Sequence, residues 1–151
     1  ASGTVLVKNI NPSGSSLYCG SVPNQGWVPW VPCAVLTVFS GKLFFRADDG
    51  THGQELWSSD GTASGTVLVK DINPASGSGN PSGLTVFNGK LFFEADDGTN
   101  GVELWSSDGT ASGTVLVKDI NPASGSGNPS GLTVFNGKLF FEADDGTNGV
   151  E

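Results

Sequence analysis

The segment LTVFNGKLFFEA, residues 84–95, carries the clearest signal of secondary structure in this chain. Two apolar, aromatic-rich runs flank the dipeptide Asn88-Gly89. A type I′ turn needs a positive φ at both central residues, and Asn-Gly tolerates that conformation better than most pairs. The stretch therefore predicts a β-hairpin in which Leu84 to Phe87 pairs with Lys90 to Ala95.

Two more strands are predicted after the hairpin. Residues 102–106 alternate apolar and polar side chains, which is the pattern of a half-buried strand. Residues 114–120 form a fourth run with apolar side chains on both faces, Val115 and Val117 on one of them. We expect this strand to be buried on both faces. A Gly-, Ser- and Pro-rich linker, residues 121–131, leads to the next hairpin.

The four-strand pattern recurs along the chain. Residues 55–103 are identical to residues 103–151, so the repeat is 48 residues long. A diverged copy opens the chain, since residues 3–8 match residues 65–70. Its segment at about 13–35 is 14 residues longer than the matching segment of the other repeats, and we call this segment the insertion. The units predicted are a diverged first repeat with the insertion at 1–62, a second repeat at 63–110, and a third repeat at 111–151 that is seven residues short.

Four antiparallel strands in each repeat are typical of a β-propeller blade. The predicted fold class is all-β with three blades in the chain. A β-solenoid is the alternative, although its coils are usually shorter and do not begin with an Asn-Gly hairpin. A single blade is too thin to bury its own faces, so neighbouring blades are expected to pack on one another. The residues expected at these contacts are Phe92, Phe93, Leu104, Trp105 and Val115.

The number of blades predicts association. Propellers usually close with about 4 to 8 blades, and this chain has at most three. We therefore expect two chains to pair, giving six blades, or the chain to belong to a longer array. Because the first and last residues fall inside a repeat, the chain is expected to be a fragment of such an array or to have been cut there on purpose.

The composition excludes several classes of protein. With 23 Gly and 8 Pro in 151 residues, and no Met, a helical bundle is strongly disfavoured. No run of about 18 apolar residues occurs, which excludes a membrane-spanning helix. Seven Lys and Arg residues stand against 15 Asp and Glu, giving a net charge of -8 without a basic cluster. Nucleic acid is therefore not expected as a partner.

Both cysteines, Cys19 and Cys33, lie in the insertion. A disulfide between them would stabilise the fold by about 3 kcal/mol on the chain-entropy model, and would indicate an oxidising compartment. We favour this disulfide over the alternative of two free thiols in a cytosolic protein. No other Cys or His lies close enough in sequence to complete a zinc site. Residues 1–8 do not form a signal peptide, so any such peptide was removed or never belonged to this chain.

Repeated Asp pairs, each followed by Gly, are the first candidate site. Clustered carboxylates and turn carbonyls can hold Ca²⁺, which takes roughly six to eight oxygen ligands. However, the alternating spacing of a dedicated calcium loop is absent, and Asp-Gly is ordinary turn chemistry. We favour turns, here and at Asp60 and Asp108, and keep calcium as the weaker alternative. The calcium candidates are Asp48, Asp49, Asp96, Asp97, Asp144 and Asp145.

Aromatic residues are the second candidate site. Trp57 and Trp105 recur within predicted strands, so we expect them in the core. Trp27 and Trp30 lie in the insertion, where no periodicity buries them, and Tyr18 is grouped with them. Exposed aromatic side chains contact sugar rings or a neighbouring subunit well. The alternative is that they fold back over the disulfide or cap the edge of the first blade.

The motif ELWSSDGT, at residues 55–62 and 103–110, resembles the repeat of the bacterial ELWxxDGT-repeat proteins. The flanking LVKDI, FNGKLFF and ADDGT segments are also similar to that family, and the resemblance covers nearly all of the chain except the insertion. It implies a propeller-like fold in secreted or cell-surface bacterial proteins. It implies no reaction, because the family offers no catalytic residues to carry over.

Three functions are consistent with these observations. The leading hypothesis is an extracellular, non-enzymatic scaffold, structural or adhesive, that associates with itself as a ring or filament. The second is a lectin-like propeller that binds glycans. The third, a polysaccharide hydrolase, rests only on the repeated carboxylates. No Ser, His and Asp set has the spacing of a nucleophilic site, and His52, the only histidine, is interpreted as a surface substitution. We therefore expect no catalysis.

Overall fold

The computed structural model describes residues 4–14 and 35–151, and over these ranges it contains strands and no helix. The strands in chain order are β1 (Thr37–Phe39), β2 (Lys42–Asp48), β3 (Gln54–Ser59), β4 (Val67–Lys70), β5 (Ser82–Phe87), β6 (Lys90–Asp96), β7 (Val102–Ser107), β8 (Val115–Lys118), β9 (Ser130–Phe135) and β10 (Lys138–Glu142). The all-β prediction is confirmed. Nothing in this part of the chain has the length and hydropathy of a membrane-crossing helix.

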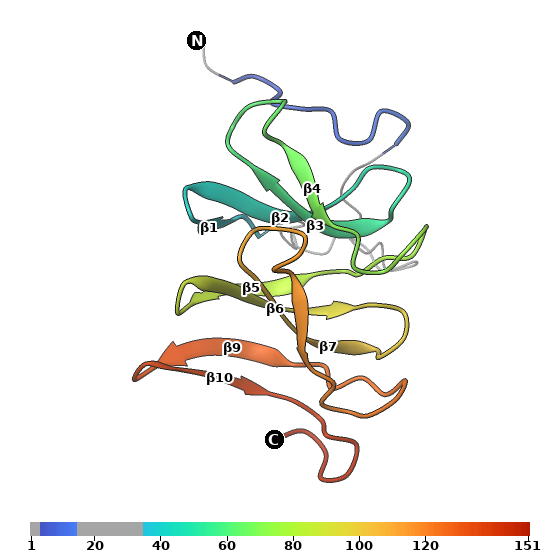
Figure 1. Ribbon diagram of the computed structural model, residues 1–151, viewed down its shortest axis with the longest axis vertical. Helices are drawn as coiled ribbons and strands as arrows, with labels where there is room; N and C mark the ends of the chain where they lie inside the picture. The colour runs from blue at the N-terminus through green and yellow to red at the C-terminus, as the bar shows by residue number, and fades with distance from the viewer. Residues whose placement is uncertain (1–3, 15–34) are drawn as a thin grey trace, which may run out of the picture.

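The strands form three antiparallel sheets in which neighbours in sequence pair with each other. The first sheet has the order β1-β2-β3-β4, the second β5-β6-β7-β8, and the third β10-β9. Figure 1 shows the three sheets stacked in chain order, with residues 4–14 beyond the first sheet. The predicted repeat boundaries at 62 and 110 fall between β3 and β4 and between β7 and β8. A sheet therefore takes its last strand from the start of the next predicted repeat.

The Asn-Gly hairpin is present as β5 and β6, as the sequence predicts. Asn88 and Gly89 have φ of 47° and 72°, which are the positive values that a type I′ turn requires. The first sheet makes the same turn with Ser40 and Gly41, at φ of 50° and 75°. Across the second hairpin, the rings of Phe87 and Phe92 lie 6.0 Å apart. The third sheet repeats the turn with Asn136 and Gly137, so a two-residue turn with positive φ joins the first two strands of each sheet.

The main hydrophobic core lies between the first and second sheets. Trp57 and Trp105 are both buried, which confirms the expectation that they belong to the core. Phe44 is buried on the face of the first sheet that contacts the second. The core cluster consists of Phe39, Phe44, Leu56, Val69, Ile72, Leu91, Phe93, Ala95 and Trp105. Sheet-on-sheet packing therefore supplies the burial that one sheet cannot supply alone.

Predicted packing residues are mostly buried, but the prediction for the fourth strand is wrong. Phe93, Leu104 and Trp105 are buried and Phe92 is half-buried, whereas Val115 and Val117 on β8 are exposed. β8 is the edge strand of its sheet. Val67, the counterpart of Val115 on the edge strand β4 of the first sheet, is exposed as well. Val69, the counterpart of Val117, is buried under the second sheet. The third sheet has only two described strands and covers less of its neighbour.

The Gly- and Ser-rich linkers join neighbouring sheets through backbone hydrogen bonds. The Asn80 amide donates to the Gln54 carbonyl of β3 at 3.0 Å, and the Gly79 carbonyl accepts from the Asp96 amide of β6 at 2.9 Å. The next linker repeats both bonds, from Asn128 to Val102 at 3.0 Å and from Asp144 to Gly127 at 2.8 Å. Each linker therefore fixes the position of one sheet relative to the next.

Candidate functional site

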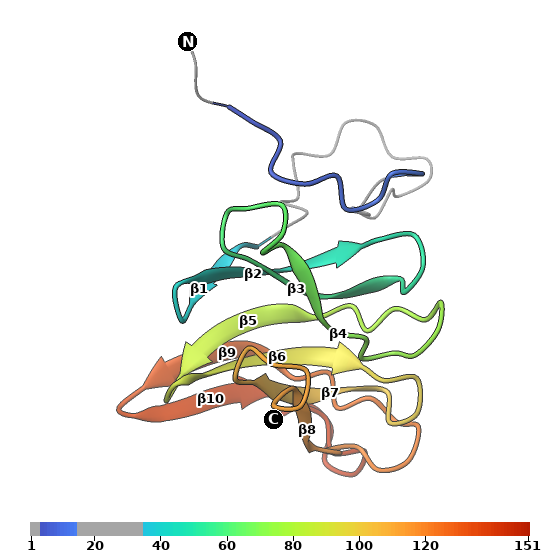
Figure 2. The ribbon, with the colours of Figure 1, turned by 45° about the horizontal axis from the view of Figure 1, so that its top comes forward.

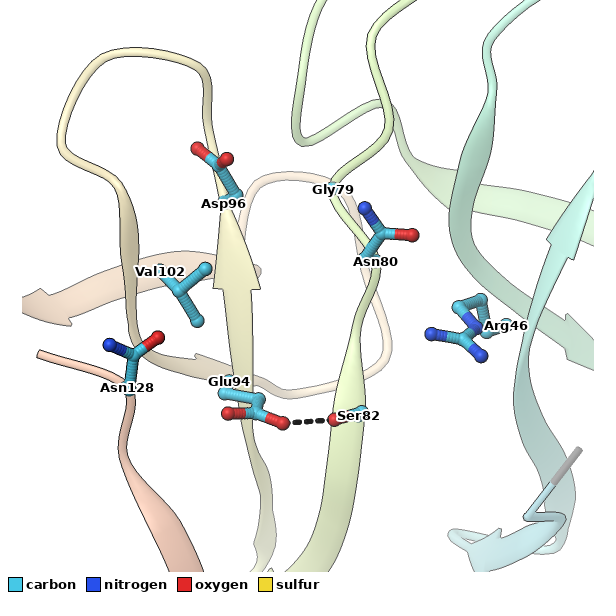
Figure 3. A pocket seen from close by; sticks show the side chains of 8 residues that line it. All are labelled: Arg46, Gly79, Asn80, Ser82, Glu94, Asp96, Val102 and Asn128. Carbon is cyan, nitrogen blue, oxygen red and sulfur yellow. Dashed lines mark hydrogen bonds between the residues drawn. The ribbon is translucent and has the colours of Figure 1, made fainter. Parts of the chain in front are cut away.

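A polar cleft of about 310 Å³ lies beside the linker between the first and second sheets. Figure 3 shows side chains from both sheets and from both linkers around it. The lining residues are Arg46, Gly79, Asn80, Ser82, Glu94, Asp96, Val102 and Asn128. Among them only Val102 has a large apolar side chain, so the cleft offers hydrogen-bonding groups rather than an apolar surface.

Arg46 is the feature that distinguishes this cleft from its repeats. The residue lies on β2, where the identical repeats have Glu94 and Glu142. In Figure 3 the guanidinium group lies on the side of Arg46 nearer to Asn80 and Ser82. Across the cleft, the Glu94 carboxylate accepts a hydrogen bond from the Ser82 hydroxyl. The first repeat thus introduces a cation beside carboxylate and amide groups, an arrangement suited to hydroxyl-rich ligands.

Beside the cleft, the Glu of the ELW motif holds the linker. Glu55 and Glu103 are both fully buried. Glu55 accepts hydrogen bonds from the backbone amides of Ile72 at 2.9 Å, Asn73 at 3.3 Å and Gly79 at 2.7 Å. Glu103 makes the same three contacts one repeat later, at 3.0, 3.4 and 2.7 Å. These carboxylates replace water as partners of the linker amides, which would otherwise be buried without acceptors.

Burial changes the proton affinity of the Glu55 side chain. Desolvation raises the pKa of Glu55 from an ordinary value of 4.5 to about 7, although the amide hydrogen bonds from Ile72, Gly79 and Asn73 act in the opposite direction. The role of Glu55 and Glu103 was not predicted from the sequence. The signal for it was a Glu at the start of an apolar strand, next to Leu-Trp. Their contacts are structural, since all three bonds go to the backbone.

The Asp pairs act as turn residues. Asp97 Oδ1 accepts hydrogen bonds from the amides of Thr99 at 2.9 Å and Asn100 at 2.8 Å. Asp145 makes the equivalent bonds to Thr147 and Asn148, and these amides lower the pKa of Asp145. The first members of the pairs, Asp48, Asp96 and Asp144, each accept from the Gly two residues later. The turn interpretation is therefore supported, as it is for Asp60 and Asp108, which cap Thr62 and Thr110.

No group of three or more His, Cys, Asp or Glu side chains able to hold a metal ion occurs in residues 4–14 and 35–151. The oxygens of the second Asp in each pair are already engaged by their own turns. Asp97, for example, receives two backbone amides on one oxygen and the Asn100 side-chain amide on the other. A bound calcium ion would have to compete with these bonds.

His52 takes the place of an Asn in its turn. Its Nδ1 lies 2.8 Å from Asp49 Oδ2, just as the Asn100 side-chain nitrogen lies 2.7 Å from Asp97 Oδ2. The hydrogen bond to Asp49 raises the pKa of His52. The histidine therefore serves the same turn as the amide it replaces.

The aromatic contact residues and the disulfide predicted in the insertion lie outside the described residues. These are Tyr18, Trp27 and Trp30 as contact residues and Cys19 and Cys33 as the disulfide. The cleft brings together residues that are far apart in the sequence, because they come from separate repeats. Comparison of the chain with models of known families, with curated proteins and with solved structures finds no match.

Proposed function

We propose that the protein is a non-enzymatic, extracellular scaffold of propeller-like blades that associates with itself in a structural or adhesive role. The contacts between the edge strands β1, β5 and β9, called here the inner edges of the sheets, support the blade interpretation. Blades arranged around an axis bring one edge strand of each sheet together, and β1 contacts β5, which contacts β9. Figure 2 shows these three edge strands following one another along one side of the stack.

Threonine side chains link these inner edges. The Thr37 hydroxyl donates to the Leu84 carbonyl at 3.4 Å, and the Thr85 hydroxyl donates to the Leu132 carbonyl at 3.5 Å. At both sheet contacts, a threonine at one position of the repeat thus bonds to the leucine carbonyl at one position of the next sheet. Antiparallel sheets also favour blades over the alternative solenoid, in which strands of successive coils pair in parallel.

One observation carries the proposal of self-association. Phe39 and Phe44 of the first sheet are 8% and 1% exposed, because the second sheet covers them. Their counterparts in the third sheet, Phe135 and Phe140, are 62% and 52% exposed. An aromatic pair that is buried at one sheet contact and exposed at the end of the stack favours contact with a further sheet.

Light scattering on the full chain tests this proposal. At tens of micromolar protein we expect masses well above the 15.4 kDa of one chain. A single species with the mass of one chain across this concentration range would show that the protein does not associate with itself.

A second candidate function is glycan binding. The polar cleft favours it, because Arg46, Asn80 and Asn128 provide donors and acceptors for sugar hydroxyls. A glycan array separates this candidate from the scaffold. Arg46→Glu, which restores the residue of the identical repeats, should abolish binding in the cleft, whereas Trp27→Ala and Trp30→Ala should abolish binding at the insertion. An array without any bound glycan would eliminate this candidate.

A further inference from the structure

The first sheet has a hollow on the face that points away from the second sheet. The hollow has a volume of about 250 Å³ and is called here the first-sheet hollow. It is lined by Val38, Gly41, Lys42, Leu43, Ser59, Asp60 and Gly61. Leu43 pairs with Ser59 across β2 and β3, so both side chains lie on this face. Phe44, the next residue, points to the opposite face and reaches the second sheet.

The same surface on the second sheet is filled. Gly109 is the counterpart of Gly61 in the identical motif. A Cβ atom added to Gly109 would lie 3.2 Å from Phe44 and 3.9 Å from Phe39, so the two rings of the first sheet cover this position. Around Gly61 no atom of the described residues lies within 4 Å of the same added atom. The surface around this glycine therefore occurs twice among the described residues. On the second sheet Phe39 and Phe44 cover it, and on the first sheet no aromatic pair from residues 4–14 and 35–151 does.

The third sheet presents the matching pair of rings. Phe135 and Phe140 occupy the positions of Phe39 and Phe44 in the repeat. Their ring centroids are 6.4 Å apart with an interplanar angle of 56°, close to the 5.6 Å and 59° of the buried pair. The third sheet thus carries the group that the second sheet accepts from the first, in nearly the same arrangement.

We propose that Phe135 and Phe140 of one copy of this chain seat in the first-sheet hollow of a second copy. This inference rests on the proposed self-association and specifies its contact, which repeats the contact between the first and second sheets. The two surfaces differ, so the contact is head-to-tail, and each added copy leaves one free end of each kind. Such a contact builds a ring if the rotation closes and a filament if it does not.

Two single variants test the proposal by blocking one end each. Phe140→Asp places a charge on the donor end, and Val38→Asp places a charge at the rim of the hollow, on a side chain that is 68% exposed. Each variant alone should scatter as a single chain of 15.4 kDa. An equimolar mixture should form a dimer, because the intact hollow of Phe140→Asp accepts the intact aromatic pair of Val38→Asp.

Val115→Asp is the matched control, since Val115 is an exposed valine on β8 and does not line the hollow; this variant should assemble like the original chain. Circular dichroism checks that each variant is folded, and Phe140→Ser replaces Phe140→Asp if the latter unfolds. Unchanged assembly of both blocked variants would overturn the head-to-tail contact while leaving self-association intact. A mixture that remains monomeric would also overturn it. If the original chain is itself a monomer, both this contact and the proposed function fail.

Discussion

Glu55 and Glu103 place a carboxylate where a strand of this pattern would ordinarily carry an apolar side chain. Each is fully buried and accepts three backbone amides of the linker that follows its sheet. A buried carboxylate is costly unless it is hydrogen-bonded. At these positions the bonds hold an otherwise irregular linker in a single conformation, and one residue thereby determines where the next sheet begins.

The raised pKa of Glu55 predicts how stability depends on pH. Burial raises the pKa in the folded state to about 7, above its ordinary value of 4.5. The folded state then binds more protons than the unfolded state between these values, so this contribution is fully present below about pH 4.5 and is lost as the pH rises through about 7. We expect the melting temperature to fall between about pH 5 and pH 8 in thermal unfolding experiments.

Glu55→Gln provides the control for this dependence. The variant has no titrating group at this position, so it should lose this part of the pH dependence. It should also be less stable by about 1–3 kcal/mol, because the amide nitrogen cannot accept a hydrogen bond from the linker. A variant whose melting temperature follows pH in the same way as that of the original chain would show that Glu55 does not titrate in this range.

The Asp pairs make a prediction about calcium. Asp97 and Asp145 use both carboxylate oxygens within their own turns. We therefore expect millimolar CaCl₂ to leave the melting temperature unchanged relative to EDTA, apart from the effect of ionic strength, which MgCl₂ at the same concentration measures. A rise of several degrees with Ca²⁺ alone would contradict the turn interpretation.

At the scale of elements, hairpins were predictable and linker contacts were not. The Asn88-Gly89 turn follows from the local backbone preference of two residues, and the predicted strands match β5 to β8 within a few residues. The linkers have no periodicity, and their bonds join Gln54 to Asn80 and Gly79 to Asp96. Such contacts depend on how two sheets stack. For the same reason the exposure of Val115 and Val117 was not predicted, since strand pattern does not reveal what covers the outer strand.

Two glycines test the packing of the linker. Gly53 and Gly41 both have positive φ, at 70° and 75°. A Cβ on Gly53 would overlap the Gly77 carbonyl oxygen of the linker, whereas a Cβ on Gly41 meets none of the described atoms within 4 Å. Gly41→Ala should therefore cost only the backbone strain, about 1–2 kcal/mol. Gly53→Ala should cost about 1–3 kcal/mol more, because the linker must move. Urea unfolding measures both, and equal losses would contradict the close contact.

At the scale of the whole molecule, the arrangement is a stack with unlike ends. The cleft was not predictable, because Arg46, Glu94 and Asn128 belong to different repeats and meet only through stacking. The repeat length and the predicted strands, in contrast, already required sheets that pack on one another. Phe135 and Phe140 are exposed at the third sheet, and under the proposed head-to-tail contact they would pack on a sheet of a second copy in the same way.

Charge predicts how the association responds to salt. Each chain carries a net charge of -8, so copies that approach one another repel. Salt screens this repulsion, with a Debye length of about 30 Å at 0.01 M and about 8 Å at 0.15 M. We expect sedimentation velocity to show larger assemblies at 0.15 M NaCl than at 0.01 M NaCl. Assembly that weakens as salt is added would indicate a contact held by ion pairs instead of aromatic packing.

The symmetry of single particles in electron microscopy shows whether copies of this chain associate through the proposed head-to-tail contact. We expect particles in which every chain makes the same head-to-tail contact, seen as closed rings with rotational symmetry or as filaments with helical symmetry. Particles with the size of a single chain, or dimers related only by a twofold axis, would contradict it.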